Sequence, residues 1–304
     1  MTKEESKDRD DDHGGPSGTL RVEVGDSDSC QIHKTLRFCL FGCEEKPPYG
    51  PTDHTSDMFL GLIRNVVQRY YPETFWDITM DYFTIQSSMD SYPTSYGVYD
   101  GVIVPGSYNS AYDANPWIER LKQELQQVLV PQDVPVLGVC FGHQVLAHSY
   151  DQGQATKCPA GPQGGGRVME CTETGTGLLG QTNVSLLYTH GDMVQQLPPH
   201  ASALGGNDRV PIQSAVYYSS SSKQEKIAAV TFQAHPEYAS EGPYQPTLRH
   251  ILHEMVGRGD LDQETAEQSL QHIKENWQEL ERDSFHVILQ SGIALGWFPD
   301  LPPN

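Results

Sequence analysis

The chain has 304 residues, and its 40 acidic and 20 basic side chains give a formal net charge of −20. This length allows one large domain or two small ones with a sizeable core. The acidic excess argues against nucleic acids and anionic membranes as partners. The chain has no run of 18 apolar residues and no apolar leader, so we expect neither a transmembrane helix nor a secretory signal. Six cysteines without a regular framework indicate free thiols, and we predict a cytoplasmic protein.

The first 34 residues are expected to form a disordered acidic tail. They are rich in charge, glycine and proline and show little apolar patterning. Residues 35–304 are expected to form a single domain, with a C-terminal helical extension from about residue 258. We therefore look for the functional residues after residue 34.

The first half of this domain alternates apolar strands with amphipathic helices. Near-continuous apolar runs predict buried strands at residues 36–42, 75–85, 99–107 and 134–139. Apolar side chains at helical spacing predict helices at residues 55–71 and from Pro116, with Thr55 or Ser56 and then Asn115 as the N-caps. This alternation predicts a three-layer α/β fold, in which helices cover both faces of a mainly parallel central sheet.

The pattern changes after Lys157. Short apolar segments joined by Gly-rich or polar turns, ending with the segment KIAAVTFQ, predict added antiparallel strands. Helices then close the chain, and a narrow apolar seam is formed by Ala266, Leu270, Ile273, Trp277 and Leu280. We expect this seam to pack on the domain, and a short coiled coil with a partner is the alternative.

A cysteine stands at the point where strand periodicity gives way to helical periodicity, in VPVLGVCFGHQVLAH (134–148). Gly138 and Gly142 flank Cys140 and permit a sharp strand-to-helix turn, a shape that carries the nucleophile in serine hydrolases. A helix amino terminus lowers the pKa of a thiol, and the N–H of Phe141 would face a developing oxyanion. The alternative interpretation is an ordinary tight turn with a small buried cysteine.

A base and a group to orient it follow in the segment AHPEY. Pro236 favours an extended backbone at His235, and residues two apart in an extended stretch share one face. Glu237 would then fix the tautomer of the imidazole and stabilise its charged form. Taken alone, the segment would be a loop histidine beside a solvated glutamate. With the cysteine elbow it predicts nucleophilic catalysis.

Together these motifs resemble the class I glutamine amidotransferase family, which uses a Cys-His-Glu triad. The G-x-C-x-G-x-Q elbow is complete from Gly138 to Gln144, and the H-P-E motif is complete at residues 235–237. Thr189-His190-Gly191-Asp192 is similar to a segment that borders the site in the glutaminase half of GMP synthetase. The resemblance covers residues 36–257 and implies that Cys140, His235 and Glu237 are catalytic.

The resemblance also implies an oxyanion hole and a substrate site. The N–H of Phe141 and a second N–H, from Gly106 or Ser107, would hold the oxyanion. The implied substrate-binding residues are Gln144, His190, Gly191 and Asp192. The loop Pro105-Gly106-Ser107 departs from the usual G-G-P-x-S and looks more like stand-alone γ-glutamyl peptidases. The segment GGGRVME (164–170) lies where the GMP synthetase type carries an E-aromatic-G segment, and it does not contain that sequence.

The predicted function is hydrolysis of the γ-glutamyl amide bond of glutamine, or of a γ-glutamyl peptide or conjugate, through a thioester. The substrate is a small molecule, and we expect no cofactor and no metal. Cys39 and Cys43 lack companion ligands and are read as core thiols rather than a zinc site. One alternative is a glutaminase subunit that supplies ammonia to a separate synthetase partner, since no synthetase motif is present. Another is a non-catalytic interaction protein that keeps the fold.

Overall fold

The computed structural model describes residues 15–129, 133–219 and 226–301. Within these ranges ten strands form one sheet in the order β1-β3-β2-β4-β5-β12-β11-β10-β7-β8, and β6 pairs with β9 in a second sheet. The strands are β1 (Gly18–Val24), β2 (Ile32–Phe41), β3 (Thr74–Phe83), β4 (Gly101–Val104), β5 (Val136–Val139), β6 (Gln154–Lys157), β7 (Gln163–Cys171), β8 (Asn183–His190), β9 (Asp192–Gln196), β10 (Ala201–Gly206), β11 (Ser214–Ser219) and β12 (Lys226–Phe232). The helices are α1 (Thr52–Tyr70), α2 (Pro116–Leu129), α3 (Phe141–His148), α4 (Glu173–Leu179), the 3₁₀ segment η1 (Pro236–Tyr244), α5 (Pro246–Gly257), α6 (Gln263–Glu275) and α7 (Trp277–Ala294).

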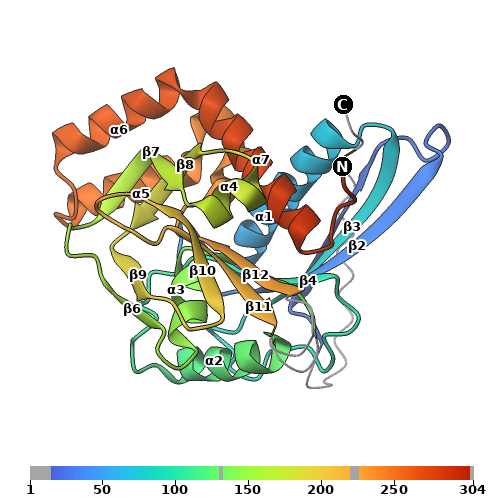
Figure 1. Ribbon diagram of the computed structural model, residues 1–304, viewed down its shortest axis with the longest axis horizontal. Coiled ribbons are helices and arrows are strands. Elements are labelled where there is room, and N and C mark those ends of the chain that lie inside the picture. Colours follow the sequence, from blue (N-terminus) through green and yellow to red (C-terminus); the bar gives the residue numbers. More distant parts are fainter. Residues whose placement is uncertain (1–14, 130–132, 220–225, 302–304) are drawn as a thin grey trace.

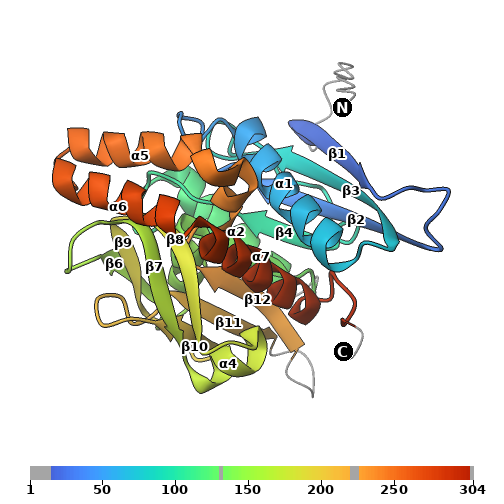
Figure 2. The same cartoon turned by 90° about the horizontal axis from the view of Figure 1, so that it is seen from above.

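The central sheet is mixed, with a parallel half and an antiparallel half. β3, β2, β4, β5 and β12 run parallel to one another, whereas β1 and the series β11, β10, β7 and β8 pair antiparallel. Apolar side chains of α1 and α7 cover one face and those of α2 and α3 cover the other (Figures 1 and 2). The predicted three-layer α/β class is confirmed. β12 lies where the two halves meet: it pairs antiparallel with β11, as expected, and in parallel with β5, which was not expected.

The expectation of a disordered tail over residues 1–34 is wrong for its second half. β1 is an edge strand that pairs antiparallel with β3, and β2 already begins at Ile32. Residues of β1 alternate between part-buried and exposed, so that Leu20 and Val22 face the core while Arg21 and Glu23 face solvent. Residues 1–14 lie outside the described ranges.

The boundaries of α1 differ from the predicted ones. The helix begins at Thr52, so Thr55 and Ser56 lie inside its first turn and do not cap it. Their hydroxyls donate instead to the carbonyl oxygens of Tyr49 (2.8 Å) and Thr52 (2.7 Å). α2 begins at Pro116, as predicted.

Two features of the C-terminal half were not predicted. α4 forms in the glycine-containing segment ETGTGLL and is capped by the Thr172 side chain, which accepts from the N–H of Gly175 at 3.0 Å. The apolar seam is divided between α6 and α7, which meet at Asn276. The seam packs on the domain, as expected, because Ile273 and Leu280 are buried in one cluster with side chains of α5.

The two cysteines on and just after β2, Cys39 and Cys43, are core residues, as predicted. Cys39 and Cys43 are fully buried, and burial raises the pKa of both thiols well above the ordinary value. In the described ranges no group of three or more His, Cys, Asp or Glu side chains is placed to hold a metal ion. No helix in the same ranges is both long and apolar enough to cross a membrane.

Candidate active site

Cys140 occupies the sharp turn between β5 and α3, with φ 51° and ψ −102°. A non-glycine residue with positive φ is strained, and such strain gathers at functional sites. The turn is held by the parallel neighbour, because the N–H of Cys140 donates to the carbonyl oxygen of Phe232 on β12 at 2.8 Å. The thiol is therefore presented at the carboxyl edge of the sheet, at the amino end of a helix.

Gly142 is required by the close approach of this turn to β4. Its N–H donates to the carbonyl oxygen of Pro105 at 3.1 Å. A Cβ at this position would lie 1.9 Å from the carbonyl oxygen of Val104. The elbow glycine thus has a steric role, and it brings α3 against the loop that follows β4.

His235 lies just beyond the end of β12, beside the elbow. The backbone N–H of His235 donates to the carbonyl oxygen of Leu187 at 2.7 Å. The imidazole ring stacks on the ring of Tyr238, with centroids 4.6 Å apart. The Nδ1 atom lies 2.6 Å from Oε1 of Glu237. We predicted that an extended backbone would place His235 and Glu237 on the same face. Instead, Pro236 begins a 3₁₀ segment, and Glu237 reaches His235 from its first turn.

The charges of the three residues are coupled. Burial acts to lower the pKa of His235, but the Glu237 carboxylate and the Cys140 sulfur outweigh it and raise this pKa to about 10. Glu237 and His235 are 0 % and 3 % exposed, so water screens their attraction little. The arrangement favours an imidazolium between a carboxylate and a sulfur, as a thiolate nucleophile requires.

The loop after β4 lies against this group and carries both candidates for the second oxyanion donor. The N–H of Gly106 is already used, because it donates to Tyr49 Oη at 3.0 Å. Ser107 thus remains the candidate, together with Phe141, whose N–H is at the open amino end of α3. Both assignments stay predictions.

Three of the four predicted substrate-binding residues come together. The side-chain amide of Gln144 donates to the carbonyl oxygen of Asp192 at 3.1 Å, and His190 Nδ1 lies 2.8 Å from the same oxygen. The Asp192 carboxylate accepts from Ser110 Oγ (2.5 Å) and Tyr112 Oη (2.9 Å), which ties it to the loop after β4. The carbonyl oxygen of the fourth, Gly191, accepts from the N–H of Cys158.

Two residues beside the predicted triad were missed in the sequence. Tyr49 Oη donates to Glu237 Oε1 at 2.9 Å, and Gln233 Nε2 donates to Cys140 Sγ at 3.6 Å. Tyr49 lies in a Pro-rich loop that reads as a plain connection. Gln233 precedes the H-P-E motif by two positions, which was the one available signal.

A small cavity of about 30 Å³ opens onto Cys140. Its walls come from the loop before α1, the loop after β4, the end of β8, the segment from His235 into η1, and α5: Tyr49, Gly106, Ser107, Tyr108, Thr189, His235, Tyr238 and Ile251. Cys140 and His235 thus face one common space.

Comparisons with known proteins indicate the family of this chain. The family model "Glutamine amidotransferase class-I" matches residues 55–254, which is more than half of the chain. The chain is 28% identical to γ-glutamyl peptidase 5 of Arabidopsis thaliana over 178 residues (56% of this chain, 64% of that protein). It is 26% identical to a glutamine-hydrolysing GMP synthase of Azoarcus sp. over 167 residues (53% of this chain, 30% of that protein).

The chain therefore spans less than two thirds of the length of these two relatives. A solved glutamine amidotransferase from Thermotoga maritima has a similar fold, with a TM-score of 0.60 and 17% identity, covering 86% of this chain and 98% of that one. The elbow and the H-P-E motif both fall inside the segment that matches the family model. The chain belongs to the class I glutamine amidotransferase family.

Proposed function

We propose that this protein is a cysteine hydrolase that cleaves the γ-glutamyl amide bond of glutamine, or of a γ-glutamyl peptide or conjugate. The observation that carries the proposal is the 2.6 Å contact between His235 and Glu237 directly beside the strained Cys140 elbow. The free thiols of the described cysteines support the further proposal that it works in the cytoplasm.

The proposed reaction uses the chain's own residues in two steps. Cys140 Sγ attacks the amide carbon, and His235 holds the proton that the thiol has lost. The N–H groups of Phe141 and Ser107 stabilise the oxyanion. His235 then donates the proton to the departing amine, and a thioester is left on Cys140. Water hydrolyses the thioester, with His235 accepting its proton, and glutamate is released.

The test is glutamate release by the purified protein, offered glutamine and a glutathione conjugate in parallel. We expect release from at least one of them and none from a Cys140→Ala protein. Full activity in the Cys140→Ala protein would overturn the proposal. A Cys171→Ala protein is the matched control, because this cysteine lies on β7, where its backbone N–H donates to the carbonyl oxygen of Thr182, and it does not line the cavity at Cys140.

A second candidate is a glutaminase subunit that passes ammonia to a separate synthetase chain. The similarity to GMP synthases supports it, and so does the small volume of the cavity at Cys140, since a partner could open the site. This candidate predicts little glutamate release by the chain alone. It also predicts a large increase when a synthetase chain is added.

A further inference from the structure

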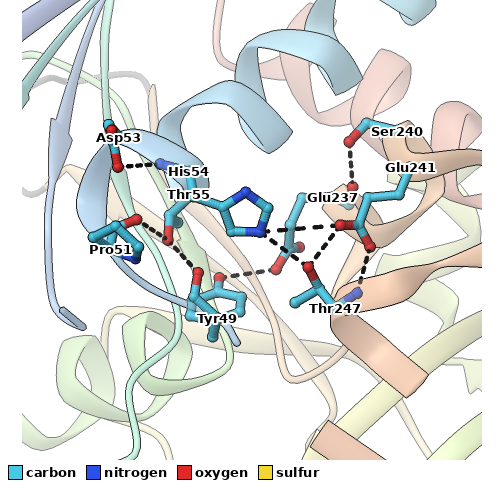
Figure 3. Close-up of polar contacts among 9 residues, drawn as sticks. All are labelled: Tyr49, Pro51, Asp53, His54, Thr55, Glu237, Ser240, Glu241 and Thr247. Carbon is cyan, nitrogen blue, oxygen red and sulfur yellow. Dashed lines mark hydrogen bonds and ion pairs between the residues drawn. The ribbon is translucent and has the colours of Figure 1, made fainter. Parts of the chain in front are cut away.

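Tyr49 joins two parts of the site that no single element connects. Its side chain is buried, and its hydroxyl donates to Glu237 Oε1 at 2.9 Å while accepting from the N–H of Gly106 at 3.0 Å. Figure 3 shows Tyr49 beside Glu237, at the amino end of α1. We propose that Tyr49 is a positioning residue that fixes the triad carboxylate and the oxyanion loop relative to each other. The kinetic part of this proposal rests on the proposed function.

The segment that carries Tyr49 is itself held firmly. The backbone carbonyl oxygen of Tyr49 accepts from Thr55 Oγ1 in α1 at 2.8 Å (Figure 3). At the other end of the segment the buried Glu44 carboxylate accepts from the N–H of Tyr108 at 3.0 Å and lies 3.4 Å from Ser107 Oγ. In the loop after β4, Gly106, Ser107 and Tyr108 thus each bond to Glu44 or Tyr49. Tyr49 also bonds to Glu237, and so links this loop to the triad carboxylate.

The bond to Glu237 matters because the carboxylate has few other partners. Its Oε1 accepts from Tyr49 and His235, and its Oε2 has no hydrogen-bond partner in the described part of the chain. Without the Tyr49 hydroxyl, the carboxylate would be held by His235 alone. The buried N–H of Gly106 would lose its acceptor as well, and a buried donor without a partner is costly. Both the base and the oxyanion loop would then be free to shift.

The kinetic test compares Tyr49→Phe with Tyr96→Phe. The phenylalanine at 49 keeps the ring that packs edge-on against His235 and removes only the hydroxyl. Tyr96 is a matched control, because it is 3 % exposed and donates to Glu124 Oε2 at 2.7 Å, among side chains that cover the other face of the sheet. We expect kcat to fall about 30-fold in Tyr49→Phe with KM within about threefold, since misplaced catalytic groups cost up to about 100-fold. Tyr96→Phe should match the wild type.

A second measurement requires no substrate, and it separates failure of this proposal from failure of the proposed function. In the wild-type protein we expect a far-downfield proton NMR signal from His235 Nδ1–H and slow hydrogen exchange at the Gly106 amide. In Tyr49→Phe the signal should shift and the amide should exchange at least tenfold faster. Fast exchange at Gly106 in the wild type would overturn the proposal, as would a Tyr49→Phe spectrum unchanged at both positions. Equal changes in Tyr96→Phe would overturn it too.

Discussion

Replacing Glu237 by glutamine should remove the charge beside His235 while keeping the shape of the site. A glutamine oxygen can accept the two hydrogen bonds that Glu237 Oε1 accepts, from His235 and Tyr49, so the tautomer of the imidazole is retained. Burial is the largest influence on the pKa of His235 and acts to lower it. Without the opposing carboxylate, this pKa should fall to its ordinary value or below.

The size of the effect follows from the protonated fraction of His235. At about pH 8, a group with a pKa of about 10 is almost fully protonated, whereas an ordinary imidazole is protonated to only about 3 %. The imidazolium favours the thiolate at Cys140, and the thiolate is the reactive form. An ordinary thiol, with a pKa of about 8.5, is still about one quarter thiolate at this pH, so we expect the rate of Cys140 alkylation by iodoacetamide to fall about fourfold in Glu237→Gln. Mass spectrometry of the Cys140 peptide separates it from the other cysteines.

The control is Glu241→Gln, which changes a second acid of η1 whose carboxylate bonds to Thr247 (Figure 3). It should alkylate at the wild-type rate.

The pH dependence of stability gives an independent check of the direction in which the pKa of His235 is shifted. Because the folded-state pKa of His235 is raised, its pairing stabilises the fold below about pH 6.5, and this contribution is lost as the pH rises to about 10. Equal alkylation rates in Glu237→Gln and the wild type from about pH 6 to 9 would refute the reasoning.

Other substitutions probe the supports of the site. Gly142→Ala should lower the free energy of unfolding by at least about 3 kcal/mol, because its Cβ would meet a backbone carbonyl, whereas Gly177→Ala in α4 has open space and should be neutral or stabilising in denaturant titrations. Asp192→Asn should weaken the bonds to Ser110 and Tyr112 and increase hydrogen exchange over residues 107–113; unchanged exchange would contradict this. Gln233→Leu removes a donor to Cys140 Sγ and should slow alkylation about fivefold, for about 1 kcal/mol of lost hydrogen bonding.

The fold could be predicted where apolar periodicity is strong, and was missed where composition hid it. β4, β5 and the second half of β2 (36–41) are nearly continuous apolar runs, as expected for strands covered on both faces. β1 alternates apolar and polar residues at the sheet edge, beside a stretch rich in acids, so its averaged composition resembled disorder. α4 was missed because two glycines lower its helix propensity, which the Thr172 cap offsets.

The same division applies to the site. Cys140, His235 and Glu237 each stand in a short motif next to an apolar strand, so sequence alone predicted that they form one site, and the structure brings them together. Tyr49 was invisible, because its partner Glu237 is 188 residues away and no local pattern marks the contact. Contacts between distant loops depend on how the sheet brings strand ends together, and a single sequence does not contain that information in readable form.

The cavity shows why the reaction class was easier to infer than the substrate. A volume of about 30 Å³ at Cys140 is about the room one water takes, whereas sites for small ligands usually measure about 300–1,000 Å³. For the proposed γ-glutamyl substrate to reach the thiol, part of the wall must move. Cys140 and His235 are anchored to the ends of central strands, whereas Tyr108 in the loop after β4 is 40 % exposed, so we expect the wall to move at Tyr108. We therefore expect the chemistry to depend on strand ends that carry sequence motifs, and the choice of substrate to depend on this exposed loop.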